Sequence, residues 1–157
     1  MLQLIQVNEE GSFTNEIRLL FSEYEKELDE NLCFQSFEEE LKNPLKKYGP
    51  PNGVLYIAEW NREVAGCIAL MPLKAETECE MKRLYVRPQF RSHQIGKALV
   101  EQLLKDAAAL GYTKMKLDTL QKLQAAITLY KKAGFVETTA YYENPLDAVI
   151  YMEKMLS

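Results

Sequence analysis

The sequence predicts one α/β domain in which helices cover both faces of a mixed β-sheet. Strand-like and helix-like segments follow one another in the order β, α, α, β, β, β, α, β, α, β, β, which is typical of a sheet between two layers of helices. The strand, helix, strand unit near the middle requires two parallel strands. The chain has 157 residues, of which 47% are apolar, enough for one continuous core but not for two ordinary domains. We therefore expect residues 1–157 to form a single domain.

The first third of the chain supplies one expected strand and two expected helices. Leu2 and Leu4 alternate with polar neighbours, as in a half-buried strand. From about residue 14 to residue 28, apolar residues recur at steps of three and four, which predicts an amphipathic helix. Ser36 and Glu39 have the spacing of a capping box, which predicts the start of a second, short helix.

The remaining elements follow from apolar patterns and from the residues that interrupt them. Residues 43–44 end the short helix because they contain a proline, and residues 46–53 are expected to form a loop. Gly111 and Gly134 are expected to end the two later helices. Those helices are predicted at residues 95–110 and 123–133. The strands are predicted at residues 54–59, 64–70, 80–86, 114–119, 135–142 and 148–155.

Composition excludes several classes of function. The formal net charge of -4 argues against binding to nucleic acid, which needs a basic surface. The chain has no long apolar run and no basic segment ahead of an apolar one at its start, so we expect no membrane span, no export and a cytoplasmic location. With a single histidine and cysteines that lack metal-ligand spacing, neither a metal site nor a disulfide framework is expected. Cys33, Cys67 and Cys79 are instead predicted to be small buried residues.

Residues 91–97 lie where a predicted strand gives way to a helix. The unpaired amides and the dipole of a helix N-terminus can hold a pyrophosphate there. Arg91 and Lys97 would add positive charge, and the small residues Ser92 and Gly96 would let an anion approach the backbone. An ordinary loop that begins a helix has a similar composition, so this segment taken alone leaves both interpretations open.

Two longer segments resemble a known family. LYVRPQFRSHQIGKALVEQLL resembles the coenzyme A signature of the GNAT superfamily of N-acetyltransferases. AAITLYKKAGF is similar to the second signature of that family, in which a helix delivers a tyrosine and ends in Gly-Phe before the next strand. The resemblance covers roughly residues 54–140. It implies a GNAT-like domain with a mostly antiparallel sheet of six to seven strands and a splayed parallel pair at its centre.

The resemblance also implies how acetyl-CoA binds. Pantetheine would lie like a strand beside the end of the segment 80–86, and the loop 91–97 would hold the pyrophosphate. Gln94 stands where the family has a glycine and is expected to turn its side chain outward, while Leu123 stands where an asparagine is frequent. Both departures bear on affinity more than on the reaction. The expected cofactor-binding residues are Leu84, Tyr85, Val86, Arg91, Ser92, His93, Gln94, Ile95, Gly96, Lys97, Leu123 and Lys132.

Acetyl transfer to an amine requires an unprotonated amine, a polarised thioester and a proton for the departing thiolate. The resemblance implies that Tyr130 supplies that proton, although a core tyrosine is the structural alternative. Glu80 is the candidate base, acting through water, and a solvated strand residue is its alternative. A backbone amide near Leu84 or Tyr85 would stabilise the oxyanion.

The acceptor is expected to be a small amine or an amino acid, attacked directly and without metal. Tyr142 and Glu143 belong to an aromatic and acidic loop that would hold a cationic substrate or pack on the N-terminal helices. Two alternatives stay open: a non-catalytic module that binds or senses acyl-CoA, and an enzyme that acetylates a protein N-terminus or lysine. The sequence also leaves open whether the chain is a monomer or a homodimer.

Overall fold

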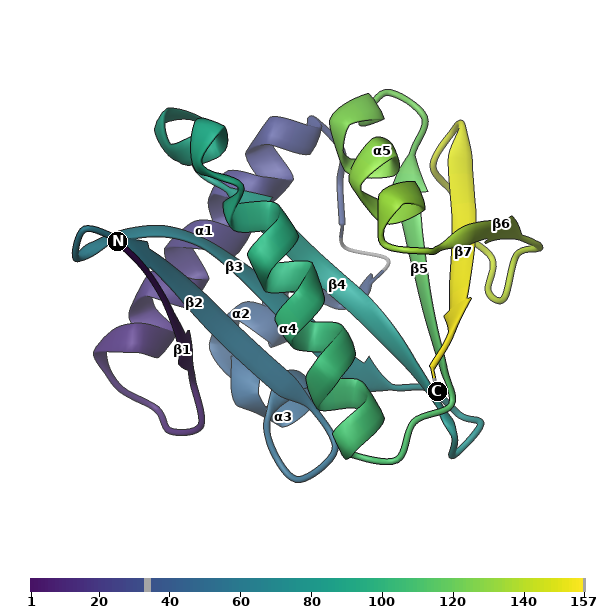
Figure 1. Cartoon of the computed structure of the whole chain (residues 1–157), viewed down its shortest axis with the longest axis horizontal. Coiled ribbons are helices and arrows are strands. Elements are labelled where there is room, and N and C mark those ends of the chain that lie inside the picture. The colour runs from purple at the N-terminus through teal and green to yellow at the C-terminus, as the bar shows by residue number, and fades with distance from the viewer. Residues whose placement is uncertain (33–34, 157) are drawn as a thin grey trace.

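The computed structural model describes residues 1–32 and 35–156, and its centre is a seven-stranded mixed sheet (Figure 1). The strand order is β1-β2-β3-β4-β5-β7-β6, and among the described strands only β4 and β5 pair in parallel. The strands are β1 (Leu2–Gln6), β2 (Val54–Trp60), β3 (Glu63–Pro72), β4 (Glu78–Val86), β5 (Lys114–Leu120), β6 (Val136–Thr138) and β7 (Val149–Met155). The helices are α1 (Ser12–Leu28), α2 (Phe37–Lys42), α3 (Pro44–Tyr48), the 3₁₀ helix η2 (Pro88–His93), α4 (Ile95–Ala109) and α5 (Gln124–Lys132).

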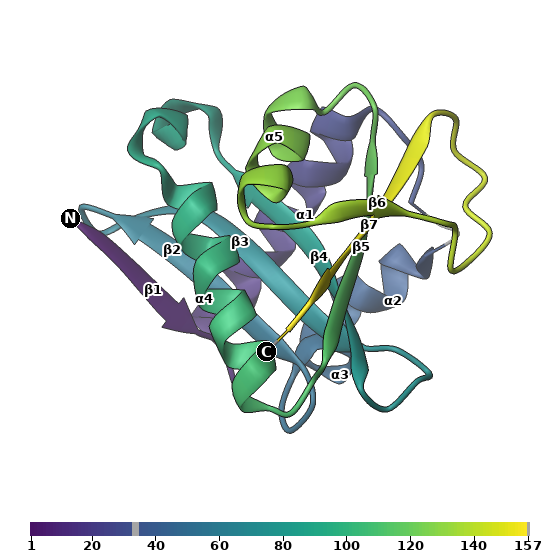
Figure 2. The same cartoon turned by 45° about the vertical axis from the view of Figure 1, so that its right-hand side comes forward.

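Helices cover both faces of the sheet, as expected. Residues along β2 alternate between two apolar clusters: Tyr56 and Ala58 pack in the cluster that includes residues of α4, whereas Leu55 and Ile57 pack in the cluster that includes residues of α1. Figures 1 and 2 show α4 on one side of β2, β3 and β4 and the N-terminal helices on the other. Because both faces are covered, β2 is a continuous apolar run instead of an alternating one.

The parallel strands β4 and β5 separate soon after they meet. Their pairing begins at Glu78 with Lys114 and ends at Glu80 with Lys116. Beyond that point β5 pairs only with β7 among the described strands, so the rest of β4 has no partner on this side. The predicted splayed pair is therefore confirmed.

A β-bulge lies on β4 at the level where the two strands diverge. Cys67 of β3 is opposite Tyr85, but Ala69 is opposite Lys82, so β4 carries one extra residue in this interval. Arg83 has a φ of 60°, and its carbonyl accepts a hydrogen bond of 3.3 Å from the Cys67 thiol. Bulges re-aim the side chains of a strand, and this one lies beside the candidate site. The sequence analysis did not predict it.

Two local expectations were wrong. The Ser36 side chain makes no capping bond and its φ is 58°, so α2 begins without the predicted capping box. The segment expected to be a loop starts as the helix Pro44–Tyr48, because proline fits the first position of a helix. The strands β2 and β3 form a hairpin with a turn of two residues, Asn61 and Arg62, both with positive φ as a tight hairpin turn requires.

The strand predicted at residues 135–142 is confirmed only as Val136–Thr138. After β6 the chain leaves the sheet, and the hydroxyls of Tyr141 and Tyr142 bind carboxylates of Glu80 and Asp118. The aromatic residues of this segment therefore make tertiary hydrogen bonds instead of sheet contacts.

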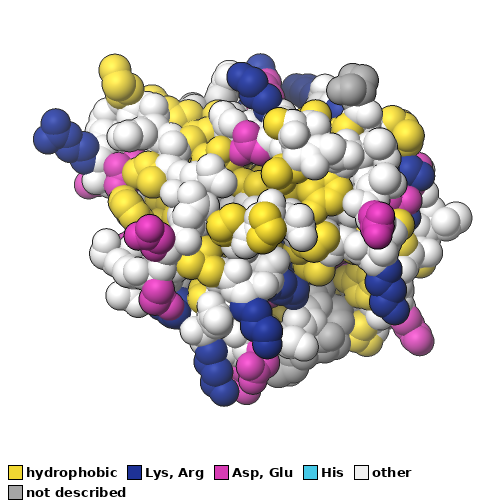
Figure 3. All heavy atoms as spheres, turned by 90° about the horizontal axis from the view of Figure 1, so that it is seen from below, with side chains coloured by type: hydrophobic (Ala, Val, Ile, Leu, Met, Phe, Trp, Pro, Cys, Tyr) yellow, Lys and Arg dark blue, Asp and Glu magenta, His cyan; other side chains and the backbone are white. Residues whose placement is uncertain are grey.

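The described residues also show the state of two cysteines, the character of the helices and the distribution of charged side chains. Cys67 and Cys79 are buried free thiols, and burial raises the pKa of Cys79 to about 12; Cys33 lies outside the described residues. None of the described helices has the length and apolar character needed to cross a membrane. No group of metal-ligating side chains occurs among the described residues. On the face seen in Figure 3, basic and acidic side chains are interspersed around apolar ones.

Candidate active site

A groove of about 1120 Å³ lies between the end of β4, the C-terminal part of α1 and the helices α4 and α5. It follows the open side of β4, where pairing with β5 has ended. The structure brings most of the expected cofactor-binding residues together on its wall. Those that line it are Leu84, Tyr85, Val86, Arg91, Gln94, Ile95, Gly96, Lys97, Leu123 and Lys132.

Ser92 and His93 do not line this groove. Both are exposed, and the His93 ring stacks on Trp60 with centroids 4.1 Å apart and an interplanar angle of 10°. The imidazole is therefore held against the β2–β3 turn. The sequence placed these two residues in the cofactor loop, but the structure places them on its outer side.

The N-terminus of α4 presents free backbone donors to the groove. The first hydrogen bond of this helix runs from the Ala98 amide to the Gln94 carbonyl at 3.2 Å. The amides of Ile95, Gly96 and Lys97 precede that bond, so they are available to an anion. A Cβ on Gly96 would lie 3.3 Å from the Cδ2 atom of Leu129, which shows how closely α5 approaches at this point.

The charged side chains of the groove are largely paired with one another. The Arg91 guanidinium donates to both carboxylate oxygens of Glu27 at 2.6 Å and to the Val86 carbonyl at 2.8 Å. The Lys97 ammonium lies 4.0 Å from a carboxylate oxygen of Glu101, whereas Lys132 forms no ion pair with another described residue. Arg91 is exposed, so its pair with Glu27 is one that an anionic ligand can replace at small cost.

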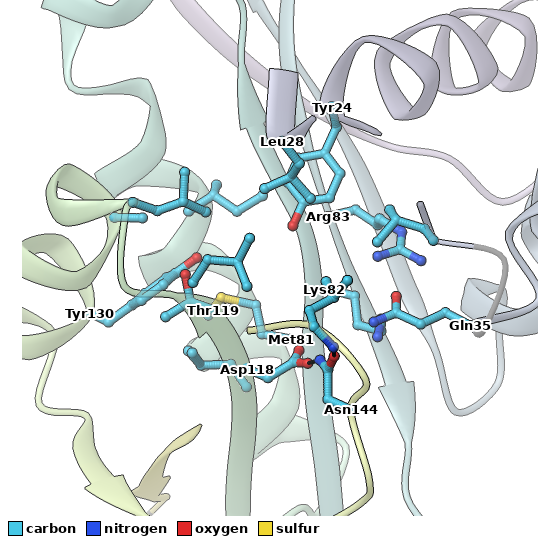
Figure 4. A pocket seen from close by; sticks show the side chains of 17 residues that line it. Tyr24, Leu28, Gln35, Met81, Lys82, Arg83, Asp118, Thr119, Tyr130 and Asn144 are labelled. Carbon is cyan, nitrogen blue, oxygen red and sulfur yellow. Dashed lines mark hydrogen bonds between the residues drawn. The ribbon is translucent and has the colours of Figure 1, made fainter. Parts of the chain in front are cut away.

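A smaller cavity of about 60 Å³ adjoins the groove near the bulge of β4. Five residues line both spaces: Tyr24, Leu28, Leu84, Leu123 and Ala126. The groove therefore leads to the cavity, and Figure 4 shows the side chains around it.

Tyr130 lies on the wall of the cavity. Its ring is buried and packs edge to face on Phe135, with centroids 6.0 Å apart. Figure 4 shows the Tyr130 and Tyr24 hydroxyls directed toward the space between α1 and α5. Burial, together with the nearby Tyr24 and Asp118, raises the pKa of Tyr130 well above its usual value, so the hydroxyl keeps its proton at neutral pH.

Glu80 lines neither the groove nor the cavity. It is buried at the last paired position of β4, where its carboxylate accepts a 2.6 Å hydrogen bond from the Tyr141 hydroxyl. The Lys82 ammonium lies 3.8 Å away. The structure therefore does not bring Glu80 into direct contact with the space around Tyr130.

The acidic group that does line the cavity is Asp118 of β5. Its Oδ2 atom accepts hydrogen bonds from the Tyr142 hydroxyl and, at 2.8 Å, from the Asn144 amide. The Gln35 amide donates to Tyr142 at 3.2 Å. Tyr142 thus lies behind the cavity wall, where it holds Asp118. Glu143, the other expected substrate residue, is exposed and does not line the cavity.

A buried ion pair stabilises the β-bulge of β4. Arg83 donates to the two oxygens of Glu40 at 2.6 and 3.0 Å, and the Tyr48 hydroxyl donates to the same carboxylate at 2.8 Å. Burial alone would raise the pKa of Glu40, but the hydrogen bonds and charge of Arg83 outweigh it, and the pKa is lowered. The pair fastens the short helices α2 and α3 to β4.

The sequence analysis missed Lys82, Arg83 and Asp118, all of which line the cavity. The sequence does contain a pattern that indicates these three residues. Two adjacent cations in the middle of a strand put one side chain on each face, and both faces of this sheet are covered by helices. Charges buried in this way need partners or ligands. Aspartate is likewise unfavourable inside a strand, so Asp118 stands out in the same manner.

Comparison with known proteins agrees with this geometry. The family model described as "Acetyltransferase (GNAT) family" matches residues 15–135. An uncharacterized N-acetyltransferase of Schizosaccharomyces pombe is 42% identical over 144 residues, which are 91% of this chain and 88% of that protein. A GNAT-family acetyltransferase from Staphylococcus aureus Mu50 has the same fold, with a TM-score of 0.82 at 20% identity over 100% of both chains. A Bacillus subtilis acetyltransferase solved in complex with CoA matches over 100% of both chains, with a TM-score of 0.70 at 18% identity.

Proposed function

The chain belongs to the acetyltransferase (GNAT) family, and from that premise we propose that it transfers an acetyl group from acetyl-CoA to the primary amine of a small molecule or an amino acid. The observation that carries the proposal is the continuity of the two spaces. A groove with free helix amides at one end opens into a small cavity whose wall holds Tyr130. This arrangement suits a long anionic donor that delivers a reactive end to an enclosed acceptor.

Acetyl-CoA fits the chemistry of the groove. The amides of Ile95, Gly96 and Lys97 would bind the pyrophosphate, and the open side of β4 from Leu84 to Val86 would bind pantetheine through its backbone. The Bacillus subtilis acetyltransferase of the same fold was solved with CoA, which supports the same ligand here. Arg91 would exchange its bond to Glu27 for a phosphate oxygen.

The reaction would proceed by direct attack. The acceptor ammonium first loses a proton, and the free amine attacks the thioester carbon so that a C–N bond forms and the carbonyl electrons move to oxygen. A backbone amide near Leu84 or Tyr85 would donate to that oxygen. The C–S bond then breaks, the sulfur leaves with its electron pair and takes the proton of Tyr130. The second proton of the nitrogen restores the tyrosine hydroxyl.

Glu80 as the base stays a prediction. Since it lines neither space, its carboxylate would have to receive the amine proton through water, as the sequence analysis assumed. Water alone is the competing acceptor of that proton. The reducing, cytoplasmic setting expected from composition is supported by the free, buried state of Cys67 and Cys79.

The size of the acceptor space favours a small molecule. A cavity of about 60 Å³ accommodates a compact amine more readily than the end of a folded protein. A module that only senses acyl-CoA would have no need of a buried tyrosine beside the junction. Turnover of acetyl-CoA in the presence of an amine separates this proposal from both alternatives.

The test is the release of free CoA thiol from acetyl-CoA, with and without amine, by the wild type and by Tyr130→Phe. The wild type should release CoA only when an amine is present. Tyr130→Phe keeps the ring and its contact with Phe135 but deletes the proton donor, so turnover should fall by about 10²–10⁴-fold, the usual contribution of general acid catalysis.

CoA affinity and melting temperature serve as controls for this variant. Both should stay near the wild-type values, because a hydroxyl without a catalytic role contributes only about 1 kcal/mol through hydrogen bonding. Turnover within a few-fold of wild type, with chemistry rate-limiting, would assign Tyr130 to the core. An absence of amine-dependent CoA release by the wild type would remove the proposed function itself.

A further inference from the structure

The cavity beside Tyr130 is lined by charges of both signs. Lys82 and Arg83 are the cations on its wall, and Asp118 is the carboxylate. Arg83 already has a partner, because two of its donor nitrogens are bound by Glu40. The groups with unused hydrogen-bonding capacity are therefore found elsewhere on the wall.

Lys82 is the first of them. Its side chain is only 5% exposed, and its ammonium donates no hydrogen bond to another described residue. Glu80 lies 3.8 Å away and is already bound by Tyr141. Burial lowers the pKa of Lys82 despite the opposing effect of Glu80 and Asp118, so an anion bound beside the amine would stabilise its charged form. A buried ammonium with free donors on a cavity wall calls for an anionic ligand.

Asp118 and Gln35 offer the opposite chemistry. The single proton of the Tyr142 hydroxyl goes to Asp118, so the Gln35 amide must present its nitrogen to Tyr142. This leaves the Oε1 atom of Gln35 buried and without a partner among the described residues. The Oδ1 atom of Asp118 accepts no hydrogen bond from another described residue. Both oxygens call for a donor, and Figure 4 shows Gln35 and Asp118 on the same side of the cavity as Lys82.

We propose that this cavity takes a zwitterionic acceptor, a small α-amino acid, with its carboxylate on the Lys82 ammonium and its amino group toward Asp118 and Gln35. This inference rests on the proposed function and names its substrate class. A diamine fits poorly, because its second cation would face Lys82 and Arg83. A plain alkylamine would leave the buried Lys82 ammonium, whose ion pair with Glu80 is 3.8 Å long, without a hydrogen-bond acceptor.

The experiment compares acceptors that differ only in the carboxylate. Glycine is paired with methylamine and alanine with ethylamine, and 1,4-diaminobutane is added as a dication. Each is tested for CoA release and, by calorimetry, for binding to the CoA-loaded protein. The wild type should favour the acid of each pair by at least about tenfold in kcat/KM and in affinity, as expected for a hydrogen-bonded charge.

The variant Lys82→Met keeps much of the aliphatic stem and removes the charge. It should raise KM for the acids, bring the acid-to-amine ratio close to one and leave CoA affinity unchanged. Lys116→Met is the matched control, because Lys116 lies on the adjacent strand and pairs with Glu78 at 3.0 Å but does not line the cavity. Its ratio should equal that of the wild type.

The proposal is overturned if the wild type binds or acetylates the amine of each pair, or the diamine, as well as the acid. It is also overturned if Lys82→Met affects acids and amines equally while still binding CoA. Should the variant fail to fold, the wild-type pairs decide the matter alone. If the wild type releases no CoA with any acceptor, the proposed function is contradicted. Calorimetry would still show whether the cavity binds the acid of each pair more tightly than the amine.

Discussion

Gln94 is the residue at which this chain departs most clearly from the family signature. It precedes α4 with a φ of 57° and a ψ of 29°, a left-handed conformation that costs a residue with a side chain about 1–2 kcal/mol. Glycine adopts this conformation freely, which accounts for the glycine of the signature. In this protein the side chain is exposed on the rim of the groove, next to the amides of the helix N-terminus.

The first prediction is that Gln94→Gly binds CoA more tightly. Removing the side chain opens the approach to the α4 amides, and one improved hydrogen bond of about 0.5–1.5 kcal/mol corresponds to about 2–10-fold in affinity. Stability should change by less than about 1 kcal/mol, because relief of the left-handed strain opposes the entropy that glycine adds to the unfolded chain. Calorimetric titration with CoA measures the affinity.

Arg62→Gly provides the control for this prediction. Arg62 also has a positive φ, of 71°, but it lies in the β2–β3 turn away from the groove. Glycine at this position therefore relieves a similar left-handed backbone strain, but the CoA affinity should not change. Equal gains in affinity for the two variants, or a loss for Gln94→Gly, would show that access to the helix amides is not what Gln94 limits.

Among the elements, β4 connects the fold to the site. Its first residues pair with β5, its bulge turns Arg83 toward α2, and its last residues border the groove. The guanidinium also lies 5.4 Å from the Phe37 ring of α2. The short helix α2, of six residues, is too short to be stable by itself, so its position depends on this buried pair with Glu40.

The second prediction concerns that pair. Glu40→Gln leaves the Arg83 charge buried without its counter-ion, which should lower the free energy of unfolding at pH 7 by about 3–5 kcal/mol. In the wild type the lowered pKa of Glu40 gives stability that is present above the ordinary value near 4.5 and is lost as pH falls through the folded-state pKa. The difference in the free energy of unfolding between the wild type and Glu40→Gln should therefore become smaller in acid. Urea unfolding at pH 7 and at several lower pH values measures it.

Glu39→Gln is the matched control on the same helix. Glu39 pairs with Lys42 at 3.7 Å, and both side chains are about three-quarters exposed, at 75% and 74%. Such a pair contributes little, about 0–1 kcal/mol. A stabilising role for the buried pair would be contradicted if Glu40→Gln lowered the free energy of unfolding as little as Glu39→Gln does. It would also be contradicted if the effect of Glu40→Gln grew in acid.

Helices and strands whose apolar residues recur at a regular spacing could be predicted from the sequence. Segments whose conformation depends on tertiary contacts could not. The helix Ile95–Ala109 was expected because its apolar residues keep helical spacing up to Gly111, which has a φ of 96°. The capping pattern at Ser36 failed, and the tyrosines after Thr138 left the sheet because Glu80 and Asp118 bind their hydroxyls. Local pattern carries no information about such partners.

The same distinction applies to the candidate site. The cofactor-binding residues expected from the family resemblance fall in two sequence segments, 84–97 and 123–132, and most of them line the groove. The cavity draws residues from α1, β4, β5 and the loop after β6. Lys82 and Asp118 become neighbours only when β4 and β5 pair at their first residues and then separate. Spacing along the chain cannot indicate a cluster of this kind.

At the scale of the whole molecule, the groove joins parts of the chain that are distant in sequence. Its walls come from α1, from β4 and from the helices α4 and α5, and the Lys122 ammonium already links the loop before α5 to the Leu28 carbonyl of α1 at 2.5 Å. A ligand that fills the groove therefore contacts both the N-terminal helix and the central part of the chain. Unfolding either part would release it.

The last prediction is that CoA raises the melting temperature of the whole chain in a single transition. A ligand selective for the folded state stabilises it by about 2.7 kcal/mol at a hundred times its dissociation constant. For a domain of this size, 1 kcal/mol corresponds to about 2–4 °C, so the shift should reach about 5–11 °C and grow with the logarithm of the CoA concentration. ATP at the same concentration shares the adenosine and a 5′-linked pyrophosphate with CoA but lacks pantetheine, and it should give a smaller shift because it cannot extend along β4. An equal shift with ATP would mean that the groove recognises only phosphate, and no shift with millimolar CoA would remove the cofactor from this groove.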